Sequence, residues 1–270
     1  MRQLHTRLIG IATVALASLL PLSAHAISTW KAGTCVSNCI ESGDEAPNVS
    51  YSAYSAAINT NGSGAYVSTG AFAQSTLAYY NGLGFGVTAP SGDSQSPNHG
   101  LDNYGYQDLI LLKFDDLVKL TQVTVGWTQY DSDITVLAYT GSTSGVNVAN
   151  TIVGKNAGNL TSSGWSLVGS YADLVTGTAK TINSQNISSS WWIITAYNTQ
   201  LGGAATGAAG TTSGLTMGVG TSFTGYDFTK LYSVAGTKGT AKIPEPASLA
   251  LASIALLGVI GIRRRKQAQR

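Results

Sequence analysis

LTQVTVGWTQYDSDITVLAY, residues Leu120–Tyr139, alternates apolar and polar side chains on both sides of a short polar centre. Successive residues of a strand point to opposite faces, so alternation of this kind is typical of a half-buried β-strand. The apolar positions that share a face are Val123, Val125 and Trp127 before the centre and Ile134, Val136 and Ala138 after it. The stretch therefore predicts two strands joined by a polar turn, a β-hairpin.

The regions on either side extend this β pattern. Asp108–Phe114 (DLILLKF) is a nearly continuous apolar run, which fits a strand that is buried on both faces. No segment between the two ends has a convincing helical period, and Ile27–Val49 is expected to be irregular with at most one strand. We predict an all-β fold, a single jelly-roll-like β-sandwich over residues 27–234, with a linker at 235–243. The other expected strands are Ala65–Tyr80, Leu83–Ala89, Trp165–Tyr171, Ala179–Ile182, Ser190–Tyr197, Leu215–Val219 and Phe223–Val234.

Charge is distributed unevenly along the chain. The whole sequence carries +2, but every Arg lies near one of the two ends. Residues 27–243 hold eight Lys against twelve Asp or Glu, which gives this region a net charge of −4. A mildly acidic region without Arg lacks the basic surface that binding to nucleic acid requires, so we expect no nucleic-acid partner.

The first 26 residues have the three parts of a secretion signal. Arg2 and Arg7 provide positive charge, Leu8–Leu20 is uninterrupted and apolar, and Ala24-His25-Ala26 is a small-x-small cleavage site. The alternative is a retained anchor, but 13 residues give only ~20 Å of helix against a ~30 Å bilayer core. We expect a signal helix at 1–26 that signal peptidase removes after Ala26.

The last residues, 244–270, combine three features in a fixed order. Pro244-Glu245-Pro246 precedes Ala247–Ile262, an uncharged run that can just span a membrane as a helix of ~24 Å. The prolines keep the motif extended outside the helix. A basic cluster follows and should hold the tail on the cytoplasmic side by the positive-inside rule. It consists of Arg263, Arg264, Arg265 and Lys266, within the tail 263–270.

This arrangement resembles the PEP-CTERM sorting signal. The resemblance implies recognition by an exosortase-like membrane protease in Gram-negative bacteria that make exopolysaccharide, and the alternative is an ordinary single-pass anchor. The central region also resembles exosortase-dependent surface proteins, which supports a location more than an activity. It does so in Ser96–Asn103 (SPNHGLDN), Asp108–Leu112 (DLILL), Gly126-Trp127, Asp131-Ser132-Asp133 and Leu137–Gly141 (LAYTG).

Two pairs of residues suggest structural roles. Cys35 and Cys39 are the two cysteines of the chain, and an exported protein with two closely spaced cysteines is expected to form one disulfide. Asp131 and Asp133 flank a tight turn and could share a Ca²⁺ ion, which prefers hard oxygen ligands. Asp102, Asn103 and Asp108 could join them if the preceding loop folds back. The alternative is that Asp and Ser simply favour turns.

Signals for catalysis are weak. His99 is the one His in residues 27–243, and no Gly-x-Ser-x-Gly motif accompanies it, so a polar turn is the ordinary explanation. Trp191 and Trp192 are adjacent, so on a strand one ring points inward and the other outward, where it could stack on a sugar. The alternative is that both rings serve packing.

We therefore expect a non-enzymatic protein of the cell surface or extracellular matrix. It would be exported across the inner membrane, anchored by the carboxyl-terminal helix, and then processed by an exosortase-like enzyme. The alternatives are a carbohydrate-binding module for exopolysaccharide and a secreted hydrolase that uses His99. No cofactor beyond structural Ca²⁺ is expected.

Overall fold

Twelve strands and four short helical segments make up the part of the chain that the structure describes. The computed structural model describes residues 26–33, 35–37, 46–61, 66–90, 99–201 and 225–239, with the single positions 93, 97, 215, 217, 218 and 223. The strands are β1 (Ser28–Lys31), β2 (Val49–Thr60), β3 (Tyr66–Thr69), β4 (Ala73–Tyr80), β5 (Gly84–Thr88), β6 (Leu101–Asp102), β7 (Tyr106–Tyr130), β8 (Ile134–Tyr139), β9 (Trp165–Tyr171), β10 (Lys180–Thr181), β11 (Ser189–Ala196) and β12 (Asp227–Lys238). The helical segments are η1 (Val148–Thr151), α1 (Ala157–Leu160), η2 (Thr161–Ser163) and η3 (Thr199–Leu201).

The strands belong to one hydrogen-bonded sheet, in the order β1-β12-β5-β4-β2-β7-β11-β8-β9 with β3, β6 and β10 at its sides. β12 also pairs with β7, so the path of pairings closes on itself. The all-β prediction is confirmed. The described strands form one hydrogen-bonded sheet rather than two separate sheets. The jelly-roll-like sandwich therefore stays a prediction.

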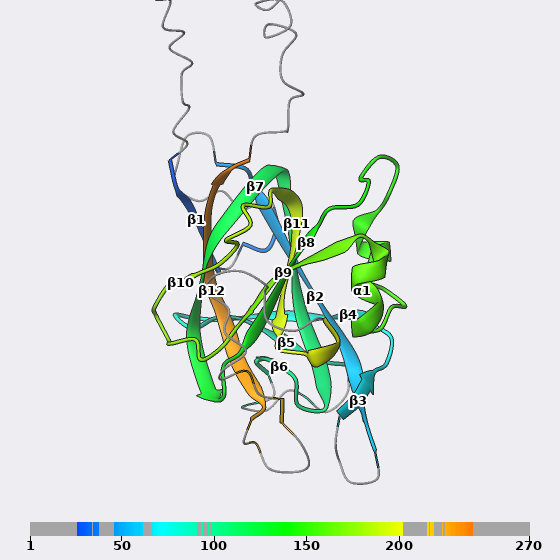
Figure 1. Ribbon diagram of the computed structural model, residues 1–270. Helices are drawn as coiled ribbons and strands as arrows, with labels where there is room; N and C mark the ends of the chain where they lie inside the picture. Colours follow the sequence, from blue (N-terminus) through cyan, green and yellow to red (C-terminus); the bar gives the residue numbers. More distant parts are fainter. Residues whose placement is uncertain are drawn as a thin grey trace, which may run out of the picture.

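β7 is the strand that joins the two halves of the sheet. Its first part, up to Phe114, lies between β2 and β11. Its second part, from Val118 onward, pairs with β12 over the whole length of that strand. Figure 1 shows β7 turning over at one end of the domain between these two parts. The two strands that we expected at Asp108–Phe114 and Leu120–Tyr130 are therefore one bent strand.

The predicted hairpin between Leu120–Tyr130 and Ile134–Tyr139 is wrong. Both segments are strands, but β8 pairs with β11 and β9 rather than with β7. Contacts with distant residues direct the turn out of the plane of β7. The amide of Asp133 donates to Asp227 Oδ1 at 2.7 Å, and the carbonyl of Asp133 accepts from the amide of Tyr197 at 3.1 Å. Tyr130 takes a left-handed backbone conformation with φ 61°, which ends β7.

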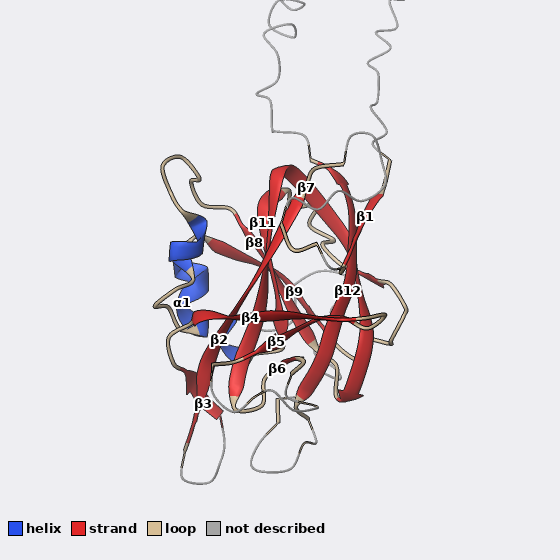
Figure 2. Cartoon of the chain, turned by 180° about the vertical axis from the view of Figure 1, so that it is seen from behind, coloured by secondary structure: helices blue, strands red, loops and turns tan. Residues whose placement is uncertain are grey.

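Two hydrophobic clusters stabilise the fold, one on each face of the first half of β7. Ile110 and Leu112 point into the larger cluster, between the two halves of the sheet. Leu109 and Leu111 point to the other face, which α1 and η1 cover with Val148 and Leu160 among others. Figure 2 shows α1 beside this side of the sheet. The prediction that Asp108–Phe114 is buried on both faces is confirmed for every residue except Lys113, which is exposed.

Four short helical segments lie in the described central region, where the sequence shows no helical period. They lie in the Gly-, Asn- and Ser-rich connection after β8 and in the turn after β11. Asn147 and Asn156 cap two of them, since their side chains accept from the amides of Ala149 and Asn159. Each segment is at most four residues long, which is too short to show a period in the sequence.

The ends of the described domain meet in the sheet. β1 begins at Ser28 and pairs with β12, so that Ser28 lies opposite Gly236. β12 continues to Lys238, so its last residues belong to the sheet rather than to the linker expected from Ala235. Among the described residues, no helix has the length and apolar character to cross a membrane. The two predicted apolar helices, at 1–26 and 247–262, lie outside or almost wholly outside the described residues.

Candidate functional site

Three aspartates converge at the turn that follows β7. The carboxylate groups of Asp131, Asp133 and Asp227 each place an oxygen within 4.8 Å of the others. Asp133 and Asp227 are fully buried, and Asp131 is partly buried. Asp131 and Asp133 come from the turn itself, whereas Asp227 is the first residue of β12. Pairing of β12 with the end of β7 brings these two parts of the chain together.

Hydrogen bonds from two further segments position these carboxylates. Asn103 Nδ2 donates to Asp227 Oδ2 at 2.6 Å, and the Asp227 amide donates to Asn103 Oδ1 at 2.9 Å. Asp173, which precedes β10, donates its amide to Asp133 Oδ1 at 2.9 Å. The geometry of the group is therefore set by the tertiary structure, before any ligand binds.

Electrostatics make this group a candidate for holding a cation. Burial raises the pKa of Asp227 well above its ordinary value, and the neighbouring charges of Asp133 and Asp131 raise it further. Bringing like charges together in a buried place is unfavourable unless protons or a cation compensate them. Converging hard oxygen ligands of this kind fit Ca²⁺.

Two of the four predicted calcium ligands, Asp102 and Asp108, do not belong to this group. They form a second buried acidic group with Asp93 instead. Asp108 Oδ1 accepts from Ser55 Oγ at 2.5 Å, while Asp102 Oδ1 accepts from the amide of Tyr104 at 3.0 Å. The other oxygen of each has no hydrogen-bond partner among the described residues. Of the three residues proposed to join Asp131 and Asp133, Asn103 is the one that contacts the group, through its hydrogen bond to Asp227.

Asp227 and Lys230 are the functional candidates that sequence reasoning missed. The signal for Asp227 was an acidic residue at the start of an apolar strand, where a charge needs a partner. Lys230 is buried, and its Nζ lies 3.7 Å from the ring centroid of Trp127 and 4.6 Å from that of Tyr80. Burial lowers the pKa of Lys230 to about 8.

His99 lies beside this lysine. Its ring contacts Tyr80 and Trp127, with centroids 4.7 and 6.4 Å away. Burial, and then the charge of Lys230, lower its pKa. Nδ1 of His99 has no hydrogen-bond partner among the described residues, so this part of the chain does not show the Ser-His-Asp arrangement of a hydrolase.

The tryptophan pair is divided between the two faces of β11. Trp192 is fully buried in the larger cluster, and its Nε1 donates to the carbonyl of Ser189 at 2.9 Å. Trp192 is therefore the inward ring and offers no surface to a sugar, so only Trp191 remains a candidate for stacking. Trp191 is partly buried, with Lys113 Nζ 5.1 Å from its ring centroid.

Several predicted features lie outside the described residues. Cys35 is described and Cys39 is not, so the disulfide stays a prediction. The same holds for cleavage after Ala26, since residues 1–25 are outside. The sorting motif Pro244-Glu245-Pro246 and the basic cluster of Arg263, Arg264, Arg265 and Lys266 also lie outside.

Comparison with known proteins identifies one region of the chain. No curated protein and no solved structure matches the chain. Residues 242–266 match the model of the PEP-CTERM protein-sorting motif. This range contains the Pro-Glu-Pro sequence, the apolar run and the basic cluster, in the predicted order. The chain therefore carries a PEP-CTERM protein-sorting motif, the mark of a protein that an exosortase-type system sorts.

Proposed function

We propose that this chain is a non-enzymatic protein of the cell surface or extracellular matrix, delivered as a jelly-roll-like β-domain. The observation that carries the proposal is the sorting motif at residues 242–266, which follows directly on the described domain. An exosortase-like protease would act at Pro244-Glu245-Pro246 after the signal peptide has directed export. The apolar run would hold the precursor in the membrane until then.

The end of the domain is suited to such processing. β12 ends at Lys238, before the matched range, and it is paired on both sides, with β1 and with β7. Around Gly236, β12 therefore has a partner strand on both of its edges within the domain. Cleavage at the Pro-Glu-Pro sequence would leave the terminal strand intact, so the released or attached domain would remain folded.

Mass spectrometry of the carboxyl terminus tests the proposal, on protein isolated from its native host. A terminus between Pro244 and Pro246 is expected for the wild type. An intact Arg270 is expected after substitution of Pro244, Glu245 and Pro246 by Ala. An intact Arg270 in the wild type would contradict processing, and turnover of glycan, peptide or ester substrates by the purified domain would contradict a non-enzymatic role.

We further propose that Ca²⁺ binds Asp131, Asp133 and Asp227. The convergence of three carboxylates within 4.8 Å supports this role. Such an ion would join the turn after β7 to the first residue of β12, which are distant in the sequence. Thermal unfolding with and without Ca²⁺ tests the proposal.

A further inference from the structure

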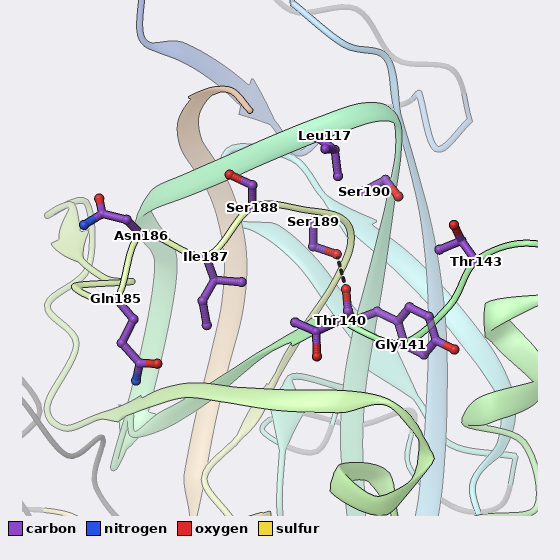
Figure 3. Close-up of a pocket in the computed structure, with 11 residues that line it drawn as sticks. Leu117, Thr140, Gly141, Thr143, Gln185, Asn186, Ile187, Ser188, Ser189 and Ser190 are labelled. Carbon is purple, nitrogen blue, oxygen red and sulfur yellow. Dashed lines mark hydrogen bonds between the residues drawn. The ribbon is translucent and has the colours of Figure 1, made fainter. Parts of the chain in front are cut away.

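A groove lies at the end of the domain where β7 bends. Its volume is about 730 Å³, which is within the usual range of ligand sites. Figure 3 shows that its wall comes from three segments: the bend of β7, the end of β8 with the residues after it, and the approach to β11. The side chains that carry its polar chemistry are Thr140, Thr143, Gln185, Asn186, Ser188, Ser189 and Ser190.

The frame of this groove is fixed by hydrogen bonds. Asn183 is buried, and its amide group donates to the carbonyls of Leu120 at 2.9 Å and Ile187 at 2.8 Å. Its Oδ1 accepts from the amide of Ile187 at 2.8 Å. Ser189 Oγ donates to the carbonyl of Tyr139 at 2.7 Å, which joins the approach of β11 to the end of β8. The groove is therefore largely formed before a ligand enters.

The polar groups that line the groove are only partly used by the protein. Among the described residues, the side chains of Thr143, Gln185, Ser188 and Ser190 make no hydrogen bond. Ser190 lies where the pairing of β11 with β7 is interrupted by a bulge, between Ser189 and Trp191. A bulge turns a side chain out of the regular alternation of a strand and is often found beside binding sites.

The lining contains hydroxyl and amide groups but no charged side chain. Leu117 and Ile187 add apolar surface among them. A ligand for this surface must donate and accept hydrogen bonds without carrying a net charge, and it must also present apolar patches. Sugar rings meet all three conditions, because hydroxyl groups surround the ring while its C–H face is apolar.

We propose that this groove binds a neutral saccharide. An anionic ligand would find no counter-charge in the lining itself, and the adjacent Lys119 already donates to Asn186 Oδ1 at 3.5 Å. A largely apolar ligand would bury the hydroxyls and amides without partners. The groove adjoins Trp191, whose amide donates to Ser189 Oγ at 3.0 Å, but neither indole ring lines it. It does not involve the three aspartates or the sorting motif.

Affinity electrophoresis of the protein purified from its host tests the inference. The gels contain neutral polysaccharides (dextran, mannan and laminarin) or the anionic polysaccharides alginate and hyaluronan, and a neutral oligosaccharide array extends the search. We expect retardation by at least one neutral glycan and about tenfold weaker binding after Gln185→Ala combined with Ser188→Ala. The control is Thr178→Ala, an exposed hydroxyl outside the groove, which should bind like the wild type.

Each other outcome would overturn the inference. Absence of binding to every neutral glycan, binding to the anionic glycans alone, or equal binding by the double variant and the wild type would each do so. Equal thermal unfolding midpoints of the variants and the wild type will show that the substitutions did not unfold the domain. A third variant, Ser190→Ala, tests the bulge separately, and it should weaken binding by a factor of a few.

Discussion

Asp227 is the residue that completes the three-carboxylate group, and its substitution by Asn gives the sharpest test of the calcium proposal. The amide keeps the size of the side chain and an oxygen that can accept from Asp133, but it removes the carboxylate charge and the acceptor that faces Asn103 Nδ2. With Ca²⁺ at about 100 times its dissociation constant, the wild type should gain ~2.7 kcal/mol, or about 5 to 10 °C in the unfolding midpoint. Asp227→Asn should lose most of this gain. Calorimetry with Ca²⁺ or EDTA measures both.

Asp115→Asn provides the matched control for that experiment. Asp115 is exposed and accepts from Asn48 Nδ2 at 2.9 Å, away from the three-carboxylate group. Its variant should respond to Ca²⁺ as the wild type does. A wild type whose midpoint is the same in Ca²⁺ and in EDTA would refute the calcium proposal.

Asp93 predicts a specific pH dependence. It is 4 % exposed, and burial raises its pKa from 3.8 to about 6. An acid whose pKa is raised on folding binds its proton more tightly in the folded state. Its contribution is therefore complete below about pH 4 and is lost as the pH rises through about 6. The change amounts to about 3 kcal/mol at most.

The measurement for Asp93 is urea unfolding in EDTA at pH 4.5 and pH 7.5. The wild type should have a lower free energy of unfolding at pH 7.5 than at pH 4.5. In Asp93→Asn this decrease should be smaller. The charge of Asp93 also helps to raise the pKa values of Asp102 and Asp108, so its removal lowers both pKa values and changes the pH dependence in the same direction. Identical pH dependence of variant and wild type would contradict the assignment.

The sequence allowed part of the candidate site to be predicted. Asp131 and Asp133 are two positions apart, so their joint role follows from local geometry alone. Asp227 is far from them in the chain, and only the pairing of β12 with the end of β7 brings it close. Likewise, alternation predicted one buried tryptophan at positions 191 and 192, but not which one, because this depends on the bulge before Trp191.

At the level of the elements, apolar patterns predicted most strands but not their partners. β5, β9 and β11 lie within a residue or two of the expected ranges. The hairpin was wrong because adjacency in the sequence was taken for pairing, whereas β11 lies between β8 and the first half of β7. A tight turn makes two strands neighbours in the sequence but does not make them pair. Here the contacts of Asp133 with Asp227 and Tyr197 direct β8 away from β7.

Close contact between β7 and the turn before β5 depends on a glycine. A Cβ at Gly126 would overlap the carbonyl oxygen of Leu83, a backbone atom that cannot move independently. We expect Gly126→Ala to lower the free energy of unfolding by about 1–3 kcal/mol, as overpacking usually does. Gly33→Ala is the control, because nothing lies near its Cβ, and it should stay within about 0.5 kcal/mol of the wild type. Urea unfolding measures both, and equal effects would refute the close contact.

At the scale of the whole molecule, charge and location separate the chain into a delivered part and delivery signals. Residues 27–243 are acidic and contain no Arg, whereas the positive charge is concentrated near the two ends. The described domain closes its sheet and pairs both edges of its last strand before the sorting motif begins. The patterns that predicted the fold lie within this domain, whereas the sorting motif lies after it, so fold and sorting were predicted from different parts of the chain.

The basic cluster after the apolar run gives the last prediction. A run of 16 residues spans ~24 Å, so it is short for a membrane and depends on its flanking charges for orientation. Substitution of Arg263, Arg264, Arg265 and Lys266 by Gln should reduce the fraction of protein processed at Pro244–Pro246, because the precursor is no longer held in the correct orientation. Cell fractionation and mass spectrometry of the carboxyl terminus measure this fraction. Lys242→Gln, which removes a positive charge on the other side of the run, should be processed normally. Normal processing of the fourfold variant would show that the cluster does not orient the precursor.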